Sequence, residues 1–466
     1  MRGGRSKGFA IALLSALAVA ACAPVPTEPE TPNFLILSID TMRRDSLRAF
    51  DPSAPELPAL DALARRSARF QDAVSTASWT LPAHASLLTG LLPGRHGATR
   101  PDRGLSKGAF SVAGALGEAG YRTVALVGSG YLAPKYGLGR GFDQYFAGPE
   151  RAGAAAGPTG PEAPWRDVFV RAGAFLRSRT PSSGPFFLLA HTYGLHDYFQ
   201  VKPATVAALG IEPPALDRAR ALDCMVAKQA CSPAEWALLE ALYDQELRFM
   251  DRAVGELLDV LEATGLADST WVFVLSDHGE GFDSPRLRLA HGGRLHEDVI
   301  RIPVVVAGPG VEPGDRATPF SLVDVAPTLL ELAGAPVPAG LDGVSMAAVL
   351  RGEAEAPLAR TRVAQEHAYV FDAQGRREEG AADDSALGVA VLRDGRWYIT
   401  APDGESLYDM GNDESQSLDL APTAPADLQA LRETARRHRA VRRGARAVAP
   451  PDAALRRQLE SLGYAR

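Results

Sequence analysis

Asn33-Phe-Leu-Ile-Leu-Ser-Ile-Asp40 and Trp271-Val-Phe-Val-Leu-Ser-Asp277-His278-Gly279-Glu280 are the stretches that decide the fold. Each is a continuous apolar run that ends in acidic residues. Such a run predicts a strand buried on both faces, as in a parallel sheet covered by helices. Open α/β sheets bind ligands at the carboxyl ends of their strands, so we expect Asp40, Asp277 and His278 to meet at one edge.

The chain alternates strand and helix patterns from residue 33 to about residue 350, which is typical of a doubly wound, mostly parallel sheet with helices on both faces. We therefore predict an α/β domain over 33–355 and a C-terminal subdomain over 356–466 with a small antiparallel sheet and terminal helices broken at Pro450-Pro451. The predicted strands are 34–39, 122–127, 185–191, 271–275 and 302–307. The predicted helices are 57–69, 109–119, 165–178, 233–264 and 323–333.

Ser78-Trp-Thr-Leu-Pro-Ala-His-Ala-Ser-Leu-Leu-Thr-Gly90 places the hydroxyl of Thr80 just ahead of a short helix that Pro82 begins and Gly90 ends. Free backbone N–H groups and the positive end of the helix dipole favour an anion there, such as phosphate or sulfate. A polar residue at this position is also a common helix cap, which is the simpler interpretation.

Two carboxylates, an imidazole and a hydroxyl suit a divalent cation. We predict that Asp40, Thr80, Asp277 and His278 hold a divalent ion such as Zn, Mn, Mg or Ca. The single imidazole and the few hard oxygens favour zinc or manganese over calcium. The alternative is that each aspartate merely caps a following helix.

The bulk composition bounds the class of protein. The chain has 466 residues, of which 46% are hydrophobic and 23% charged, and its net charge of −7 gives no sign of a nucleic-acid surface.

The N-terminus is predicted to be an export signal. Residues 1–21 carry a basic region and a short apolar core, and Val19-Ala-Ala-Cys22 resembles a bacterial lipobox. Cys22 would then carry the lipid and 22–32 would form a Pro-rich tether, making the protein an envelope lipoprotein at the outer membrane, facing the periplasm. The alternative is a plain signal peptide cut near Ala21.

Cys224 and Cys231 lie together in a segment, about 202–232, that is predicted to be an insertion able to overhang the site. An exported protein meets an oxidising compartment, so we expect a structural disulfide between them. Residues 150–165, rich in Gly, Ala and Pro, are predicted to be a surface loop.

The ordered set of motifs resembles the sulfatase family of the alkaline phosphatase superfamily. The resemblance includes the Asp40 strand, Ala85-Ser-Leu-Leu-Thr-Gly90, Leu116-Gly-Glu-Ala-Gly-Tyr-Arg-Thr123, Gly141-Phe-Asp143, Ser276-Asp-His-Gly-Glu280, His291-Gly-Gly-Arg-Leu-His-Glu297, Arg301-Ile-Pro303, Val323-Asp-Val-Ala-Pro-Thr-Leu-Leu330, Leu341-Asp-Gly343 and Leu462-Gly-Tyr464. It implies a large α/β domain with a smaller C-terminal domain. It also implies one or two metal ions at the strand ends and a covalent intermediate on the nucleophile.

The departures from the family decide the expected chemistry. Members that cleave sulfate esters carry Cys-x-Pro-x-Arg, or Ser at the first position, and oxidise that residue to formylglycine; here the window reads Thr80-Leu-Pro82-Ala-His84. Threonine cannot give the aldehyde. The paired Asp-Asp is Asp40-Thr41, the sulfate-gripping Gly-Lys-Trp-His resembles Gly128-Ser-Gly-Tyr131, and Asp-Pro-His is Gly194-Leu-His196. The pattern is similar to the threonine branch, which includes phosphodiesterases and phosphoethanolamine or phosphoglycerol transferases.

The resemblance implies roles for further side chains. Thr80 is the expected nucleophile, with His84, His196 and Tyr131 as donors to the ester oxygens and His196 or His291 as the acid for the leaving group. His291 is alternatively a ligand of a second metal. Ser129, Tyr131 and Arg294 are the expected substrate-binding residues.

Three functions compete. The first is a metal-dependent hydrolase or transferase acting on phosphate monoesters or diesters of a small molecule, lipid or glycan through a covalent Thr80 intermediate. The second is a sulfatase that works without formylglycine. The third is a non-catalytic binding protein on the cell surface, for which Thr80 and metal would be dispensable.

Overall fold

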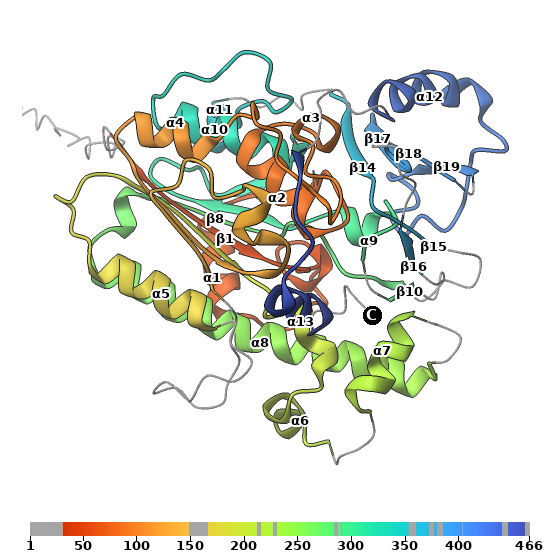
Figure 1. Cartoon of the computed structure of the whole chain (residues 1–466), viewed down its shortest axis with the longest axis horizontal. Helices are drawn as coiled ribbons and strands as arrows, with labels where there is room; N and C mark the ends of the chain where they lie inside the picture. Colours follow the sequence, from red (N-terminus) through yellow and green to blue (C-terminus); the bar gives the residue numbers. More distant parts are fainter. Residues whose placement is uncertain are drawn as a thin grey trace, which may run out of the picture.

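The computed structural model describes residues 31–148, 166–211, 216–226, 231–283, 288–289, 291–353, 360–371, 377–379, 385–402, 404–439 and 446–461. At its centre lies a sheet whose middle strands, β8 and β1, are labelled in Figure 1. The sheet has eight strands in the order β12-β2-β11-β8-β1-β7-β5-β6. In that order the strands are Gly314–Arg316, Ala68–Phe70, Val304–Ala307, Thr270–Leu275, Asn33–Ile39, Phe186–Thr192, Arg122–Gly128 and Gln144–Gly148.

The middle of this sheet is parallel. β1 pairs in parallel with β8 on one side and with β7 on the other, and β7 pairs in parallel with β5. β11 is antiparallel to both of its neighbours, β8 and β2. The predicted mostly parallel sheet is therefore confirmed, and the carboxyl ends of β1, β7 and β8 lie at one edge.

Helices cover both faces of the sheet, as the sequence predicted (Figure 1). In β1, Phe34 and Ile36 join one buried cluster with α2, α4 and α10, while Leu35 and Leu37 join another with α1, α5 and α8. A strand whose side chains alternate between two apolar cores is apolar at every position, which explains the unbroken run in the sequence. The helices are α1 (Pro58–Arg65), α2 (Thr80–Thr89), α4 (Val112–Glu118), α5 (Arg166–Arg177), α8 (Pro233–Ala263) and α10 (Val325–Leu332).

The C-terminal region forms the predicted small antiparallel sheet, in the order β14-β17-β18-β19. These strands are Arg362–Glu366, Gly388–Arg393, Arg396–Ala401 and Gly404–Asp409, and α12 (Pro425–Arg439) packs on them. The predicted helical tail is interrupted by β20 (Arg446–Ala447), which pairs with β4 (Arg103–Gly104) of the α/β domain before α13 (Ala453–Ser461).

Two predicted boundaries were wrong. The helix expected over 57–69 ends at Arg65, and Ala68–Phe70 is strand β2. Ala68 and Phe70 are fully buried there, and β2 pairs with β11, so sheet pairing overrides the helical pattern. Thr80 is the first residue of α2 rather than the residue ahead of it, and Gly90 ends the helix in the left-handed conformation, as expected.

The predicted signal peptide, Cys22, most of the tether, the loop 150–165 and Leu462-Gly-Tyr464 lie outside the described residues. Among the helices that the structure describes, none combines the length and hydropathy needed to cross a membrane.

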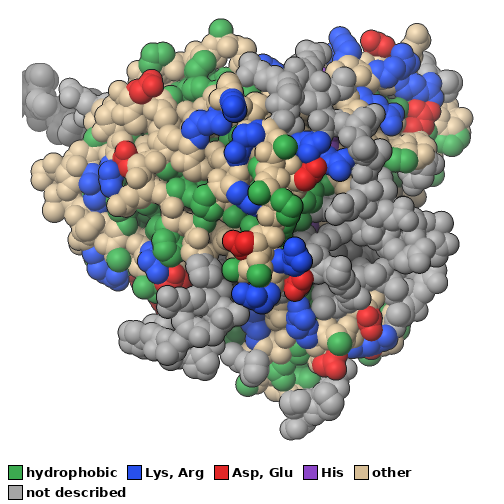
Figure 2. Space-filling model, in the orientation of Figure 1, with side chains coloured by type: hydrophobic (Ala, Val, Ile, Leu, Met, Phe, Trp, Pro, Cys, Tyr) green, Lys and Arg blue, Asp and Glu red, His purple; other side chains and the backbone are tan. Residues whose placement is uncertain are grey.

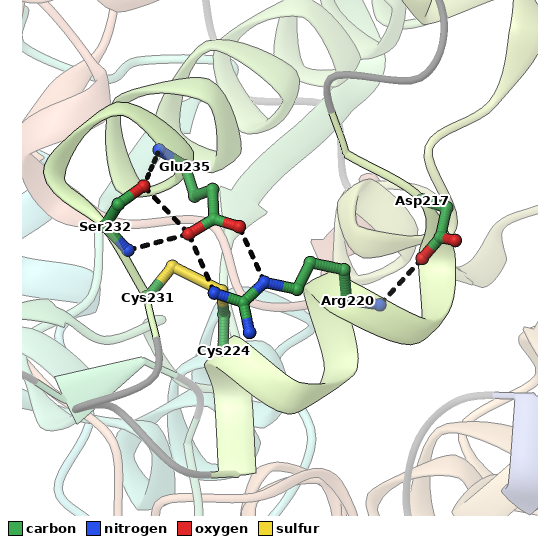
Figure 3. The surroundings of a disulfide bond; sticks show 6 residues. All are labelled: Asp217, Arg220, Cys224, Cys231, Ser232 and Glu235. Carbon is green, nitrogen blue, oxygen red and sulfur yellow. Dashed lines mark hydrogen bonds and ion pairs between the residues drawn. A yellow bond between two sulfur atoms is a disulfide. The ribbon is translucent and has the colours of Figure 1, made fainter.

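The insertion is held by the predicted disulfide. Cys224 in α7 (Arg218–Val226) is bonded to Cys231, just before α8, with 5.0 Å between their Cα atoms. Figure 3 shows Glu235 beside this bond, where it accepts hydrogen bonds from the Ser232 hydroxyl and from Nε and Nη2 of Arg220. α7 also contacts the short 3-10 helix His196–Gln200, so the insertion reaches the segment that carries His196.

His96, the last residue of α3 (Pro93–His96), contacts α2 at Pro82 and Ser86. Its Nδ1 accepts from the backbone N–H of Ala98 at 3.1 Å, while Nε2 lies 3.2 Å from both Ser86 Oγ and the Pro82 carbonyl oxygen. Because Nδ1 accepts, the ring is neutral with its hydrogen on Nε2. Burial is the main cause that lowers the pKa of His96 to about 3.

We expect this histidine to make the fold sensitive to acid. The pKa in the unfolded chain is near 6.5, so the unfolded state binds the extra proton first, and stability is lost as the pH falls from 6.5 toward 3. One such group adds a slope of about 1.4 kcal/mol per pH unit. Urea unfolding between pH 4 and pH 7 should show a smaller slope for His96→Gln than for the wild type. Ser86→Ala keeps the titrating ring and should keep the slope; equal slopes for His96→Gln and the wild type would contradict this assignment.

Candidate functional site

The predicted acidic residues meet where β1 and β8 end. Asp40 directly follows β1, and Asp277 and His278 follow β8 after one residue. One ligand atom from each of the three lies within 4.8 Å of the others, and all three side chains are fully buried. His278 Nε2 is 3.8 Å from Asp40 Oδ1 and 3.5 Å from Asp277 Oδ2.

Thr80 joins this cluster from the first turn of α2, which is buried along its whole length. Its Oγ1 donates to Asp40 Oδ2 at 3.1 Å and lies 3.5 Å from His278 Nε2. All four residues predicted to hold a metal are therefore brought together, although they come from three separate parts of the chain.

The chemistry of these donors fits a cation. Asp40 Oδ1 and Asp277 Oδ2 are buried and accept no hydrogen bond among the described residues. Burial is the main cause that raises the pKa of Asp40 and raises that of Asp277 to about 7, with the charge of Asp40 adding to the shift at Asp277. Two buried carboxylates with open lone pairs are stabilised by a bound positive charge. Burial also lowers the pKa of His278, which leaves a neutral imidazole able to ligate a metal.

Thr41 stands where classical relatives were expected to carry a second aspartate. Its φ of 59° is left-handed, which is costly for a β-branched residue. Its Oγ1 donates to the carbonyl oxygen of Asp40 at 2.6 Å. The Thr41 hydroxyl thus fixes the backbone that presents Asp40. The left-handed backbone of Thr41 is strained, and the surrounding site keeps it in this conformation.

His84 lies one turn after Thr80, under the site. Its Nδ1 is 3.0 Å from the Thr80 carbonyl oxygen and 3.4 Å from Asp277 Oδ2, while Nε2 is 3.0 Å from Ser38 Oγ. Burial is the main cause that lowers its pKa to about 3, so the ring is neutral. These contacts suit His84 to hold the first turn of α2 against Asp277, as a positioning residue.

His191, near the end of β7, also lies at the site, although it is not among the residues predicted above. Its Nε2 lies 3.3 Å from Asp40 Oδ2, and its ring packs edge-on against His84. His84, His191 and Asp277 form a second group whose potential ligand atoms lie within 4.8 Å of one another. A histidine ending an apolar strand looks the same in sequence whether it packs or binds.

His196 and His291 form the outer wall of the site. Their rings lie 4.9 Å apart, centre to centre, and His291 is 4.4 Å from His278. Burial lowers the pKa of His196, but the Asp197 carboxylate, 3.9 Å from His196 Nδ1, and the charge of Asp40 outweigh it, so the net shift is upward. Glu280, 3.3 Å from His291 Nδ1, has its pKa raised to about 7, mainly by burial. The wall thus gathers groups suited to proton transfer.

The three residues predicted to bind substrate lie in different surroundings. Tyr131 is buried in the core, with its ring edge-on to Trp79, and Ser129 is half-buried just before it. Arg294 is 5% exposed and pairs with Asp298, while its Nε and Nη1 meet no acceptor among the described residues. The positive charge of Arg294 also opposes the rise in the pKa of Glu280.

Comparison with known proteins now identifies the family. Residues 32–335 match the family described as Sulfatase. This chain belongs to the sulfatase family. The choline-sulfatase of Rhizobium meliloti is 32% identical over 197 residues, which is 41% of this chain and 35% of that protein. The Delta 4,5-hexuronate-2-O-sulfatase of Bacteroides thetaiotaomicron is 23% identical, with 87% of this chain and 88% of that protein covered.

A phosphonate monoester hydrolase from Silicibacter pomeroyi shares the fold, with a TM-score of 0.68 and 20% identity over 90% of this chain and 100% of that one. The chain is thus an ester-bond hydrolase by family, with relatives named for sulfate esters and a structural neighbour named for a phosphonate ester. The family's members are metal-dependent, in agreement with the donor set at Asp40, Asp277 and His278.

In this member of the sulfatase family, the C-terminal subdomain supports the site through Glu366, at the end of β14. Its carboxylate accepts from Ser78 Oγ at 2.7 Å and from the backbone N–H of Gly293 at 3.1 Å. Gly292 N–H in turn donates to the Ser78 carbonyl oxygen at 2.9 Å. Glu366 therefore ties the loop before Thr80 to the loop after His291.

We expect Glu366→Ala to lower kcat by about tenfold or more, because small shifts of positioned groups are costly for catalysis. Glu366→Gln keeps one acceptor oxygen and should recover part of the rate. Steady-state kinetics measure the change in kcat, and thermal unfolding shows whether each variant is still folded. Glu405→Ala, in the surface pair with Arg432, is the matched control and should leave kcat unchanged. A Glu366→Ala enzyme with wild-type kcat would contradict the positioning role.

Proposed function

We propose that this protein is a metal-dependent hydrolase or transferase of phosphate esters, with Thr80 as the nucleophile. The observation that carries the proposal is the position of Thr80 Oγ1, 3.1 Å from Asp40 Oδ2 and 3.5 Å from His278 Nε2. Beside it lie two buried carboxylate oxygens, Asp40 Oδ1 and Asp277 Oδ2, that accept no hydrogen bond from any residue the structure describes. A hydroxyl packed there only as a helix cap would accept a backbone N–H, and Thr80 follows the capping position rather than filling it.

The residues that would hold the metal are Asp40, Asp277 and His278, with Thr80 facing them. A divalent cation bound there supplies positive charge that lowers the pKa of the Thr80 hydroxyl and offsets the charge of the ester. We favour zinc or manganese.

The chain's own residues then account for the reaction. Thr80 Oγ1 gives its proton to Asp40 Oδ2, to which it donates at 3.1 Å, and attacks phosphorus. The bond from phosphorus to the leaving alcohol oxygen breaks. That oxygen takes a proton from His196 or His291, whose rings form the outer wall. Water or a second alcohol gives its proton to the imidazole and attacks the phosphothreonine. The bond from phosphorus to Thr80 Oγ1 breaks, and Oγ1 takes its proton back from Asp40 Oδ2.

The main task of the site is to stabilise the negative charge on the equatorial oxygens of the phosphoryl group. The backbone N–H groups that open α2 and the imidazole of His196 are the proposed donors. The buried guanidinium of Arg294, which has two nitrogens without an acceptor among the described residues, is proposed to bind an anionic group of the substrate.

The second candidate is a sulfuric ester hydrolase that works without formylglycine. The relatives named choline-sulfatase and hexuronate-2-O-sulfatase favour it. Threonine argues for phosphate, because a threonine sulfate has no aldehyde hydrate through which sulfate is eliminated. It would have to be released by direct attack at sulfur.

One assay ranks the two candidates. The purified metal-loaded protein is offered an aryl phosphate monoester, a bis-aryl phosphate diester and an aryl sulfate. We expect one of the phosphate esters to give the highest kcat/KM. A preference for the sulfate of more than about tenfold, or about 1.4 kcal/mol in the barrier, would reverse the order.

We also propose export and lipid attachment at Cys22, on the strength of the N-terminal sequence. A membrane anchor would suit a lipid or glycan ester of the cell envelope as substrate. Mass spectrometry of the protein from a bacterial host would show a lipidated Cys22 at the mature N-terminus.

A further inference from the structure

A cavity of about 410 Å³ lies at the seam between the α/β domain and the C-terminal subdomain. Residues after α2 and before α10 line one side, and the start of β14, the end of β17 and the last turns of α12 line the other. Its volume falls in the range of small-molecule sites, roughly 300–1,000 Å³.

This cavity is far from Thr80. Thr80 begins α2, whereas Leu92, which lines the cavity, follows the other end of that helix. Ten residues of helix place the two ends of α2 roughly 14 Å apart at about 1.5 Å per residue. An anion in the cavity would therefore occupy a second site.

The lining is strongly basic. It includes four arginines, Arg360, Arg362, Arg393 and Arg437, together with His438. Asp342 is the one acid among the described lining residues, and it is already paired with Arg95 at 2.6 Å. The lining therefore carries an excess of positive charge. Basic side chains also gather on the surface over α12 (Figure 2).

Two of the arginines are held rigidly from behind. Arg360 makes a two-pronged contact with buried Asp324, and Arg362 makes one with Asp72 at 2.6 and 2.7 Å. Such paired contacts fix the orientation of a guanidinium.

The other two are exposed and more weakly engaged. Arg393 Nε is 3.6 Å from the exposed carboxylate of Asp394, and Arg437 Nη2 donates to the Thr434 hydroxyl at 3.2 Å. No buried carboxylate offsets either charge in the part of the chain that the structure describes. These side chains are free to turn toward a ligand, and an exposed pair such as Arg393–Asp394 costs little to break.

We propose that this cavity binds a small polyanion that carries two or more sulfate, phosphate or carboxylate groups. Arg393 and Arg437 contact the anion directly, while Arg360 and Arg362 supply fixed positive charge at the wall. The site is separate from the proposed ester-cleaving centre and does not depend on it.

The test uses sucrose octasulfate as the polyanion, because sulfate groups chelate metals weakly, and sucrose as the uncharged control. Titration calorimetry is done on the full metal-loaded chain at low salt. We expect binding of sucrose octasulfate and none of sucrose. The double variant Arg393→Gln/Arg437→Gln should bind at least about tenfold more weakly, with thermal unfolding and activity toward a small aryl ester unchanged.

Arg436→Gln is the matched control. Arg436 neighbours Arg437 on α12, is exposed, pairs with Glu433 and does not line the cavity. It should bind sucrose octasulfate within about twofold of the wild type, which separates the cavity from general surface charge. The proposal is overturned if the wild type does not bind the polyanion, if the double variant binds as the wild type does, or if Arg436→Gln weakens binding as much as the double variant.

Discussion

Thr80→Ala is expected to lower kcat toward the best ester substrate by on the order of 10⁴-fold or more, since it removes the attacking oxygen itself. The fold should survive. The change deletes one hydrogen bond to Asp40 and a few atoms from a buried position, which costs about 1–2 kcal/mol of stability. Stopped-flow kinetics and thermal unfolding measure the two effects separately.

Two further variants serve as a conservative replacement and as a control. Thr80→Ser keeps the hydroxyl and should retain the rate within about tenfold, losing only a methyl group. Thr89→Ala removes a buried hydroxyl at the far end of the same helix, where Oγ1 donates to the Ala85 carbonyl oxygen, and should affect stability alone. If Thr80→Ala kept a tenth or more of the wild-type rate, the nucleophile would be another group and the covalent mechanism would fail.

The nucleophile assignment also predicts a covalent species. Brief acid quenching during turnover of a phosphate ester should leave a phosphate group on the peptide that contains Thr80. The same peptide from Thr80→Ser should carry it on serine.

The strand ends of the site could be read from the sequence because each is a local pattern. An unbroken apolar run such as Asn33–Ile39 can bury both faces only in a covered sheet, and an acid directly after it must lie at the sheet edge. Strand β2 could not be found in this way. It has three residues, and its pairing with β11 brings together segments more than 230 residues apart.

The supporting residues escaped sequence reasoning for a related reason. Glu366 contacts Ser78 across 288 positions of the chain, and no spacing rule links them. His191 could not be singled out, because a histidine that ends an apolar strand can either pack in the core or bind a ligand. Arg294 was singled out from sequence, but its pairing with Asp298 became visible only in the structure.

Removal of the metal is the second large effect that we expect. Chelation should lower activity by about 10³-fold or more and also lower the melting temperature, because it leaves Asp40 and Asp277 as neighbouring buried carboxylates without a compensating charge. Addition of zinc or manganese should restore both. A ligand present at about a hundred times its Kd stabilises the folded state by about 2.7 kcal/mol, a change readily seen in thermal unfolding.

The variant Asp277→Asn tests whether the change in melting temperature comes from metal bound at this site. The variant should be inactive, and metal should no longer raise its melting temperature. Without metal it should be at least as stable as the metal-free wild type, because one buried negative charge has been removed from the pair. Asp251→Asn is the control: Asp251 is also a buried carboxylate, but it accepts from the backbone of Leu60 and Ala59, away from the site. It should lose stability in both states and keep its response to metal. A chelated wild type with full activity and an unchanged melting temperature would mean that these carboxylates are neutralised by protons alone, and the metal-dependent mechanism would then be wrong.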